Sequence, residues 1–197
     1  MDLCVIVLTN ELNKTIQSPK YQPKVCYHLG NKSILEICLD QWIQLNPKRI
    51  ILMVSKKEIQ QINRIVKYLN YSKDLSYSIF DSGDNKHSLK CAKSCYEDYN
   101  VLVVPGNAPK LTSKSLFKYI KKSQSFKINN KIFFLNKLDI ELIDTPEKLP
   151  EIYIEEADTE MIETQRQYDI LLAKYNKHPS WTQKMWSKLK RKNKGKS

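Results

Sequence analysis

The chain has 197 residues and a formal net charge of +12, and only four of its residues are glycine. Average usage would give roughly 14 glycines in a chain of this length. None of the four, Gly30, Gly83, Gly106 and Gly195, forms a G-x-G pair. The sequence therefore excludes a G-x-G-x-x-G dinucleotide fingerprint and a G-x-x-x-x-G-K phosphate loop. Its apolar runs have the length of strands and are too short to span a membrane.

The positive charge is concentrated at the C-terminus. Seven of the twelve excess charges lie in residues 180–197, which contain no acidic residue. Four apolar residues of this segment recur at the spacing of one helical face: Trp181, Met185, Trp186 and Leu189. We predict a domain over residues 1–177 and a basic tail over residues 178–197. The tail is either an amphipathic helix that docks on an acidic membrane surface or a protein partner, or a disordered end whose tryptophans pack on the domain. Lysine is abundant throughout the chain, so specific nucleic-acid binding is not favoured.

The cysteine count indicates the compartment. The five cysteines are Cys4, Cys26, Cys38, Cys91 and Cys95. An odd number of cysteines, two of them in apolar segments, favours reduced thiols over a disulfide framework. The N-terminus has no basic region typical of a signal peptide. We therefore expect a cytoplasmic protein.

Strands and helices are predicted to alternate over the first 120 residues. Short apolar runs predict strands over residues 3–8, 49–54, 76–80 and 100–104. Helical spacing predicts helices over residues 34–45, 55–69, 87–96 and 113–122. Ser33 and Glu36 form a capping-box pattern at the start of the first helix. The alternation indicates an α/β fold with a mostly parallel sheet, whose ligands bind at the carboxyl ends of the strands.

The second half of the sequence is less regular. Apolar runs predict strands over residues 131–135, 140–143 and 151–154, and helical spacing predicts a helix over residues 161–175. A run of acidic residues precedes that helix and extends into its start. Its simplest interpretation is a set of solvent-exposed charges that complement the helix dipole.

Several blocks of the sequence resemble the sugar-nucleotide pyrophosphorylase family. Residues 23–40 contain P-K-V, H-L-G-N-K and I-L-E, residues 83–92 place His87 on a family histidine, and residues 101–112 read V-L-V-V-P-G-N-A-P-K-L-T. Residues 161–175 resemble the closing helix of the family. The blocks are most similar to the uridyltransferase domain of bacterial N-acetylglucosamine-1-phosphate uridyltransferase (GlmU type).

The resemblance implies a GT-A-like, Rossmann-like nucleotidyltransferase fold and a reaction. In that reaction a sugar 1-phosphate attacks the α-phosphate of a nucleoside triphosphate, which is UTP in the uridyltransferase that the blocks resemble, and Mg²⁺ assists while UDP-N-acetylglucosamine or a related nucleotide sugar forms. Lys24 matches the family lysine that contacts phosphate and is the candidate catalytic residue. The other candidate nucleotide-binding residues are Leu8, Thr9, Asn10, Gly83, His87 and Gly106.

The resemblance also implies a metal site. The Mg²⁺-binding aspartate of the family falls on Asn107, and a second metal position, an asparagine in the family, falls on Glu163. An amide replaces the family's carboxylate at Asn107, and a carboxylate replaces its amide at Glu163. The pair therefore still offers one carboxylate and one amide to a metal ion. Asp144 is an alternative ligand, because residues 144–149 read D-T-P-E-K-L, which resembles a segment of molybdenum-cofactor-type nucleotidyltransferases.

Two departures from the family pattern leave the activity open. Residues 8–15 lack the glycines and the arginine of the family's triphosphate loop, and side chains there would crowd a backbone that approaches phosphate. Only 53 residues separate Pro109 from Glu163, so the sugar-binding lobe is reduced. The chain is either an active nucleotidyltransferase with a diverged loop, or an inactive relative that serves as a binding, regulatory or membrane-docked module.

Two local patterns have simpler interpretations. His87, Cys91 and Cys95 recur every four residues, as a zinc site would require, but a cysteine stripe facing the core is favoured. Residues 105–109 also fit an ordinary turn between a strand and a helix, with Gly106 present for its backbone freedom.

Overall fold

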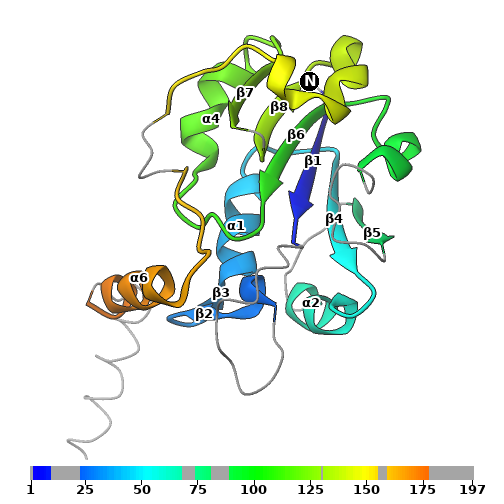
Figure 1. Ribbon diagram of the computed structural model, residues 1–197. Helices are drawn as coiled ribbons and strands as arrows, with labels where there is room; N and C mark the ends of the chain where they lie inside the picture. The colour runs from blue at the N-terminus through cyan, green and yellow to red at the C-terminus, as the bar shows by residue number, and fades with distance from the viewer. Residues whose placement is uncertain are drawn as a thin grey trace, which may run out of the picture.

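The computed structural model describes residues 2–9, 23–67, 74–80, 89–129, 131–154 and 159–177 (Figure 1). Residues 10–22, 81–88 and 178–197 lie outside the described residues, and with them the start of the helix predicted over residues 87–96 and the predicted basic tail. In the described part of the chain, no helix is long and apolar enough to cross a membrane.

An open six-stranded sheet forms the centre of the described fold, with the strand order β5-β4-β1-β6-β8-β7. Its strands are β1 (Leu3–Leu8), β4 (Arg49–Ser55), β5 (Asp74–Phe80), β6 (Asn100–Pro105), β7 (Phe126–Asn129) and β8 (Ile132–Leu135). The strands β5, β4, β1 and β6 are parallel, whereas β8 is antiparallel to both β6 and β7. The predicted mostly parallel sheet is confirmed.

The central strands are apolar on both sides because both faces of the sheet are covered. Val5 and Val7 of β1 point into one hydrophobic cluster, and Cys4 and Ile6 point into the other. Successive side chains of a strand alternate between faces, so a strand buried on both faces is a continuous apolar run. This is why the short apolar runs of the sequence predicted these strands correctly.

Three helices cover the first face: α1 (Ile34–Ile43), α2 (Ile59–Val66) and α4 (Ser113–Ile120). The predicted capping box at the start of α1 is present, since Ser33 accepts a hydrogen bond from the Glu36 amide and the Glu36 carboxylate accepts one from the Ser33 amide. Thr112 caps α4. The α2 helix is shorter than predicted, because a turn closed by the Glu58 amide on the Ser55 carbonyl precedes it.

On the second face, the helix predicted over residues 87–96 is present only in part within the described residues. Residues 89–91 are helical, and a turn and the 3₁₀ helix η2 (Lys93–Cys95) follow them, closed by bonds between residues three apart. Leu89, Ala92 and Tyr96 are the buried residues here. Cys91 and Cys95 are exposed, so the prediction of a cysteine stripe facing the core is wrong. The apolar side chains take the core positions and turn the thiols outward.

Two predicted strands of the second half are wrong. Residues 140–143 belong to the 3₁₀ helix η3 (Lys137–Asp144), in which Ile140 and Ile143 both face the core. A spacing of three places them on one face of a 3₁₀ helix. Residues 151–154 form only an isolated bridge, from Glu151 to Lys127. A second 3₁₀ helix, η4 (Pro146–Lys148), precedes them.

A strand was also missed. The strand β7, with the sequence F-K-I-N, alternates buried and half-buried residues and pairs with β8. Its four residues lie just after α4, where no long apolar run marks them.

The C-terminal helix α6 (Gln165–Lys177) lies against the hairpin of β2 (His28–Leu29) and β3 (Lys32–Ser33) (Figure 1). The Tyr168 hydroxyl donates to the His28 carbonyl at 2.8 Å, and the Tyr168 ring meets Tyr27 edge to face. Leu29, Ile162 and Leu171 share a buried cluster with α1. Segments from the first and last thirds of the chain, α1 with the β2–β3 hairpin and α6, therefore pack against each other beside the sheet.

Candidate functional site

The carboxyl ends of β1 and β6 lie side by side at one edge of the sheet. The Gly106 amide, directly after β6, donates to the carbonyl oxygen of Leu8, the last residue of β1, at 2.8 Å. Thr9 is 3% exposed, and both its hydroxyl and its amide donate to the Met53 carbonyl, at 2.6 and 3.2 Å. The Thr9 hydroxyl therefore fixes the end of β1 to β4. Three of the predicted nucleotide-binding residues, Leu8, Thr9 and Gly106, thus lie at this edge.

A side chain at Gly106 would crowd its neighbours, and the residue has no unusual backbone angle. A Cβ atom at this position would lie 3.2 Å from Val25 Cγ1 and 3.3 Å from both the Leu8 carbonyl oxygen and Val7 Cγ1. Among the described glycines, a positive φ occurs at Gly30 and not at Gly106. The interpretation that Gly106 serves backbone freedom in a turn is therefore wrong. The glycine lets the strand ends and Val25 pack closely.

Lys24 is the buried cation of this edge. It begins the 3₁₀ helix η1 (Lys24–Cys26), which follows Pro23, and the whole residue is 7% exposed. Its Nζ donates to the Glu163 carbonyl oxygen at 2.9 Å. Two residues that the sequence analysis assigned to one site from distant blocks are thus in direct contact.

Asn107 lies near Lys24 and Glu163 because it is hydrogen-bonded to Ile162, the residue before Glu163. Asn107 is 1% exposed. The Ile162 amide donates to the Asn107 carbonyl oxygen at 2.9 Å, and Asn107 Nδ2 donates to the Ile162 carbonyl oxygen at 3.2 Å. The two bonds place Glu163, the next residue, near the end of β6.

The Glu163 side chain pairs with a cation that the sequence analysis missed. Lys131, in the turn between β7 and β8, places its Nζ 3.1 Å from Glu163 Oε1, and the two side chains are 43% and 38% exposed. Lys131 is one of many lysines and lies in none of the blocks that resemble a family. Only the fold brings its turn to this edge.

A local cap holds Glu163 just outside α6. The amides of Glu163 and Thr164 both donate to Gln167 Oε1 at 2.9 Å, and the Gln167 amide donates to the Thr164 hydroxyl at 3.2 Å. This reciprocal arrangement resembles a capping box. The helix predicted over residues 161–175 therefore begins later, at Gln165, and Glu163 lies in an extended segment rather than on the helix.

The other predicted metal ligand, Asp144, lies elsewhere. It ends η3, and its carboxylate acts electrostatically on Lys93 and Tyr96, which belong to the second face of the sheet. Asn10, Gly83 and His87 are outside the described residues. Within the described residues, no group of three or more His, Cys, Asp or Glu side chains is placed to hold a metal ion.

Three cysteine thiols are buried and have raised pKa values. Burial raises the pKa of Cys4, Cys26 and Cys38 from 9.0 to about 12 in each case. A thiol is nucleophilic or metal-binding only as the thiolate. Burial therefore favours the protonated thiols and disfavours a nucleophilic or metal-binding role for them.

The fold was compared with known proteins. No protein-family model matches the chain, and no curated protein matches it by sequence. A nucleotidyl transferase from Methanothermobacter thermautotrophicus superposes with a TM-score of 0.68 at 10% identity, over 89% of this chain and 98% of the other. The 4-diphosphocytidyl-2C-methyl-D-erythritol synthase from Anaerococcus prevotii gives a TM-score of 0.64 at 14% identity, over 89% and 96%.

This chain shares its fold with a nucleotidyl transferase of known structure. A third structure with this fold is the Rv0371c protein of Mycobacterium tuberculosis in complex with manganese, with a TM-score of 0.65 at 13% identity over 87% of this chain and 98% of the other. The likeness is one of fold, at identities of 10 to 14%. It confirms the Rossmann-like architecture predicted from the sequence.

Proposed function

We propose that the chain is a nucleotidyltransferase that moves a nucleotidyl group from a nucleoside triphosphate, with UTP as the first candidate, to a sugar 1-phosphate. The observation that carries the proposal is the convergence of Lys24, Asn107 and Glu163 at the carboxyl-end edge of a sheet with this fold. Ligands of open α/β sheets bind at that edge.

The proposed reaction needs positive charge at the phosphates. A bond forms between a phosphate oxygen of the sugar 1-phosphate and the α-phosphorus, and the bond from that phosphorus to the leaving pyrophosphate breaks. The equatorial oxygens and the pyrophosphate carry the negative charge. Lys24 is buried, so its ammonium group is weakly screened and acts strongly on a nearby anion. Lys131 supplies a second ammonium group at a half-exposed position.

The donor atoms at this edge fit a divalent cation that is shared with phosphate. Mg²⁺ commonly binds one or two protein oxygens together with phosphates and waters. Asn107 and Glu163 would hold it through one amide and one carboxylate oxygen. Asn107 Nδ2 is bonded to the Ile162 carbonyl, which fixes the orientation of the amide. A bound ion would neutralise phosphate charge. The manganese complex of the Rv0371c protein supports a divalent metal.

The ion pair between Lys131 and Glu163 affects the order of binding. The ammonium group partly neutralises the carboxylate that a cation needs. We therefore infer that metal and triphosphate bind together, because the phosphates attract Lys131 away from Glu163. Metal alone is expected to bind weakly.

Calorimetry with turnover assays tests the proposal. The full chain is titrated with UTP, CTP, ATP and GTP in MgCl₂, and pyrophosphate release is then measured with several sugar 1-phosphates. We expect one triphosphate to bind and to be turned over. Binding without turnover would instead establish a binding or regulatory module, and no binding at millimolar nucleotide would overturn both.

Two matched variants locate the site. Lys24→Met removes the buried ammonium group and keeps the length of the side chain, and we expect nucleotide affinity to fall about tenfold. Lys48→Met is the control, because Lys48 is exposed and its amide bonds to Leu3, at the opposite end of β1. Equal affinities in the two variants would place the nucleotide elsewhere.

A further inference from the structure

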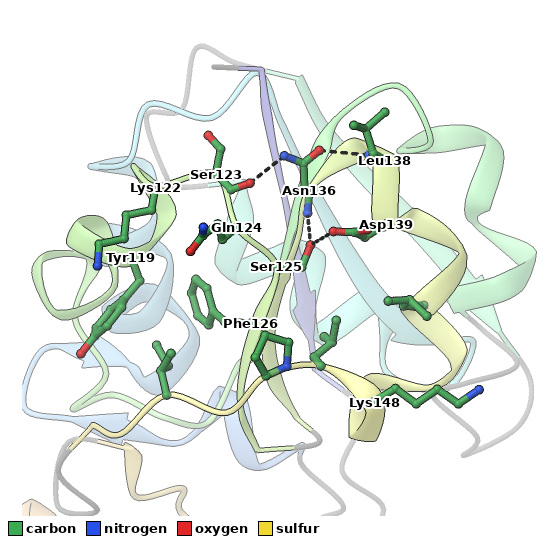
Figure 2. Close-up of a pocket in the computed structure, with 14 residues that line it drawn as sticks. Tyr119, Lys122, Ser123, Gln124, Ser125, Phe126, Asn136, Leu138, Asp139 and Lys148 are labelled. Atoms are coloured by element: carbon green, nitrogen blue, oxygen red, sulfur yellow. Dashed lines mark hydrogen bonds between the residues drawn. The ribbon is translucent and has the colours of Figure 1, made fainter.

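Figure 2 shows the residues that line a cavity, whose volume is about 650 Å³. Lys24, Asn107 and Glu163 lie at the carboxyl end of β6, and the cavity lies at the other end of the sheet. It is bounded by the end of α4, the segment that enters β7, and the segment that leaves β8. Because Leu135 of β8 pairs with Val101 near the start of β6, this is the amino end of β6. The volume lies within the range of small-molecule sites, roughly 300–1,000 Å³.

One wall of the cavity is a connected polar network (Figure 2). The Ser125 hydroxyl accepts a hydrogen bond from the Asn136 amide at 2.8 Å and donates to the Asp139 carboxylate. Asn136 Nδ2 donates to the Ser123 carbonyl at 2.7 Å, and Asn136 Oδ1 accepts from the Leu138 amide at 3.0 Å. These bonds fix the wall before any ligand arrives. They also occupy Asp139, the one acidic residue that lines the cavity.

The floor of the cavity is apolar. Phe126 and Leu149 both line it and are 3% and 4% exposed. The Phe126 ring is held by a stacked contact with Phe134, at a centroid distance of 5.5 Å. At the wall, the Leu138 side chain is 89% exposed. An apolar ring or branched chain placed here would remove the exposed surface of Leu138 from water, against a floor that is already buried.

Two lysines at the rim of the cavity favour a negatively charged ligand. Lys122 and Lys148 line the cavity from two sides and are exposed (Figure 2). The lining thus carries two ammonium groups and one carboxylate, and the carboxylate is bonded to Ser125. We propose that this cavity binds a small anion with an aromatic or branched apolar body, whose anionic group meets a rim lysine.

Two dyes that differ in charge test the proposal on the full chain. The probes are 1-anilinonaphthalene-8-sulfonate, an aromatic anion, and N-phenyl-1-naphthylamine, its uncharged counterpart. We expect one molecule of the anionic dye to bind per chain, and to bind more tightly than the neutral dye. Binding at several equivalent sites, or equal affinity for both dyes, would overturn the proposal. No nucleotide is needed, so the result does not depend on the proposed function.

Exposed positions provide variants that leave the core intact. Lys122→Glu and Lys148→Glu should each weaken the anionic dye about fivefold, the size expected for a half-solvated charge pair, and leave the neutral dye unchanged. Lys121→Glu makes the same charge change outside the lining and should have no effect. Gln124→Trp, which puts an indole in the lining, should weaken both dyes. Equal anionic-dye affinities in the Lys121 and Lys122 variants, or undiminished binding in the Gln124 variant, would place the dye elsewhere.

Discussion

Asn107 and Ile162 are joined by two hydrogen bonds although they lie 55 positions apart in the sequence. The Ile162 amide donates to the Asn107 carbonyl at 2.9 Å, and Asn107 Nδ2 donates to the Ile162 carbonyl at 3.2 Å. Asn107 is 1% exposed and Ile162 is fully buried. Water cannot readily replace either bond. The pair holds the segment that carries Glu163 against the end of β6.

Removal of the Asn107 side-chain bond should destabilise the fold. In Asn107→Leu the buried Ile162 carbonyl loses its Nδ2 donor, and we expect the free energy of unfolding to fall by about 1–3 kcal/mol. Urea unfolding measures this change. Asn176→Leu, at an exposed position of α6, is the control and should change stability by less than about 0.5 kcal/mol. Equal losses in both variants would contradict a structural role for the Asn107 side chain.

A carboxylate at position 107 should make stability depend on metal. In Asn107→Asp the new group has no donor for the Ile162 carbonyl and places a negative charge beside it. We expect a lower melting temperature than in the original chain when EDTA is present, and a larger rise on addition of MnCl₂, because a second charged ligand strengthens cation binding. Thermal unfolding with and without MnCl₂ measures both. Identical manganese shifts in the two proteins would argue against a metal at Asn107.

Removal of Lys131 should separate metal affinity from nucleotide affinity. Lys131→Met removes the ammonium group that is paired with the Glu163 carboxylate, so Mn²⁺ alone should bind about fivefold more tightly, whereas UTP should bind more weakly. Electron paramagnetic resonance of free Mn²⁺ measures the first change and calorimetry the second. Lys137→Met opens a comparable exposed ion pair, with Asp98 at 3.3 Å, and should change neither. The prediction fails if Mn²⁺ affinity stays constant in the Lys131 variant.

A side chain at position 106 should strain the contact between β1, β6 and η1. Gly106→Ala places Cβ 3.2 Å from Val25 Cγ1, and we expect a loss of about 1–3 kcal/mol in the free energy of unfolding. Val25→Ala removes that methyl group, so Gly106→Ala should cost less in the Val25→Ala background. Chemical unfolding of the two single variants and the double variant measures the coupling. Strict additivity would show that Val25 is not the obstacle.

Stability should fall at alkaline pH because of the buried thiols. Burial raises the pKa of Cys4, Cys26 and Cys38 from 9.0 to about 12. Between these values the unfolded chain has released thiol protons that the folded chain retains, so unfolding is favoured as pH rises. Each thiol contributes about 1.4 kcal/mol per pH unit, and the full stability is present below pH 9.

Urea unfolding between pH 8 and pH 11, with a phosphine reductant present, measures this slope. Cys38→Ala removes one buried thiol and should make the slope shallower by about 1.4 kcal/mol per pH unit, whatever its effect on stability at pH 8. Cys91→Ala, at an exposed position, is the control. A slope that is the same in all three proteins would exclude the buried thiols as its cause.

The sequence by itself determined the parallel part of the sheet and the capping of the first helix. Strands buried on both faces must be continuous apolar runs, and the pattern of Ser33 and Glu36 is local, so both are visible in a short stretch of residues. The resemblance of its blocks to a known family also groups Lys24, Asn107 and Glu163, and contacts through Ile162 and the Glu163 carbonyl bring the three residues near one another in the fold.

Only the tertiary structure decided the remainder of the site. Lys131 reaches Glu163 because β7 and β8 form a hairpin, and β7 is a four-residue strand with no distinctive pattern. Gly106 is needed because three segments converge on it, which no local turn preference encodes. The short apolar segment that contains Ile140 and Ile143 is compatible with a strand or with a 3₁₀ helix. Only its packing against the core shows that it is a 3₁₀ helix. Local propensity fixes the elements that are apolar throughout or capped locally, whereas contacts between distant segments fix the charges at the site.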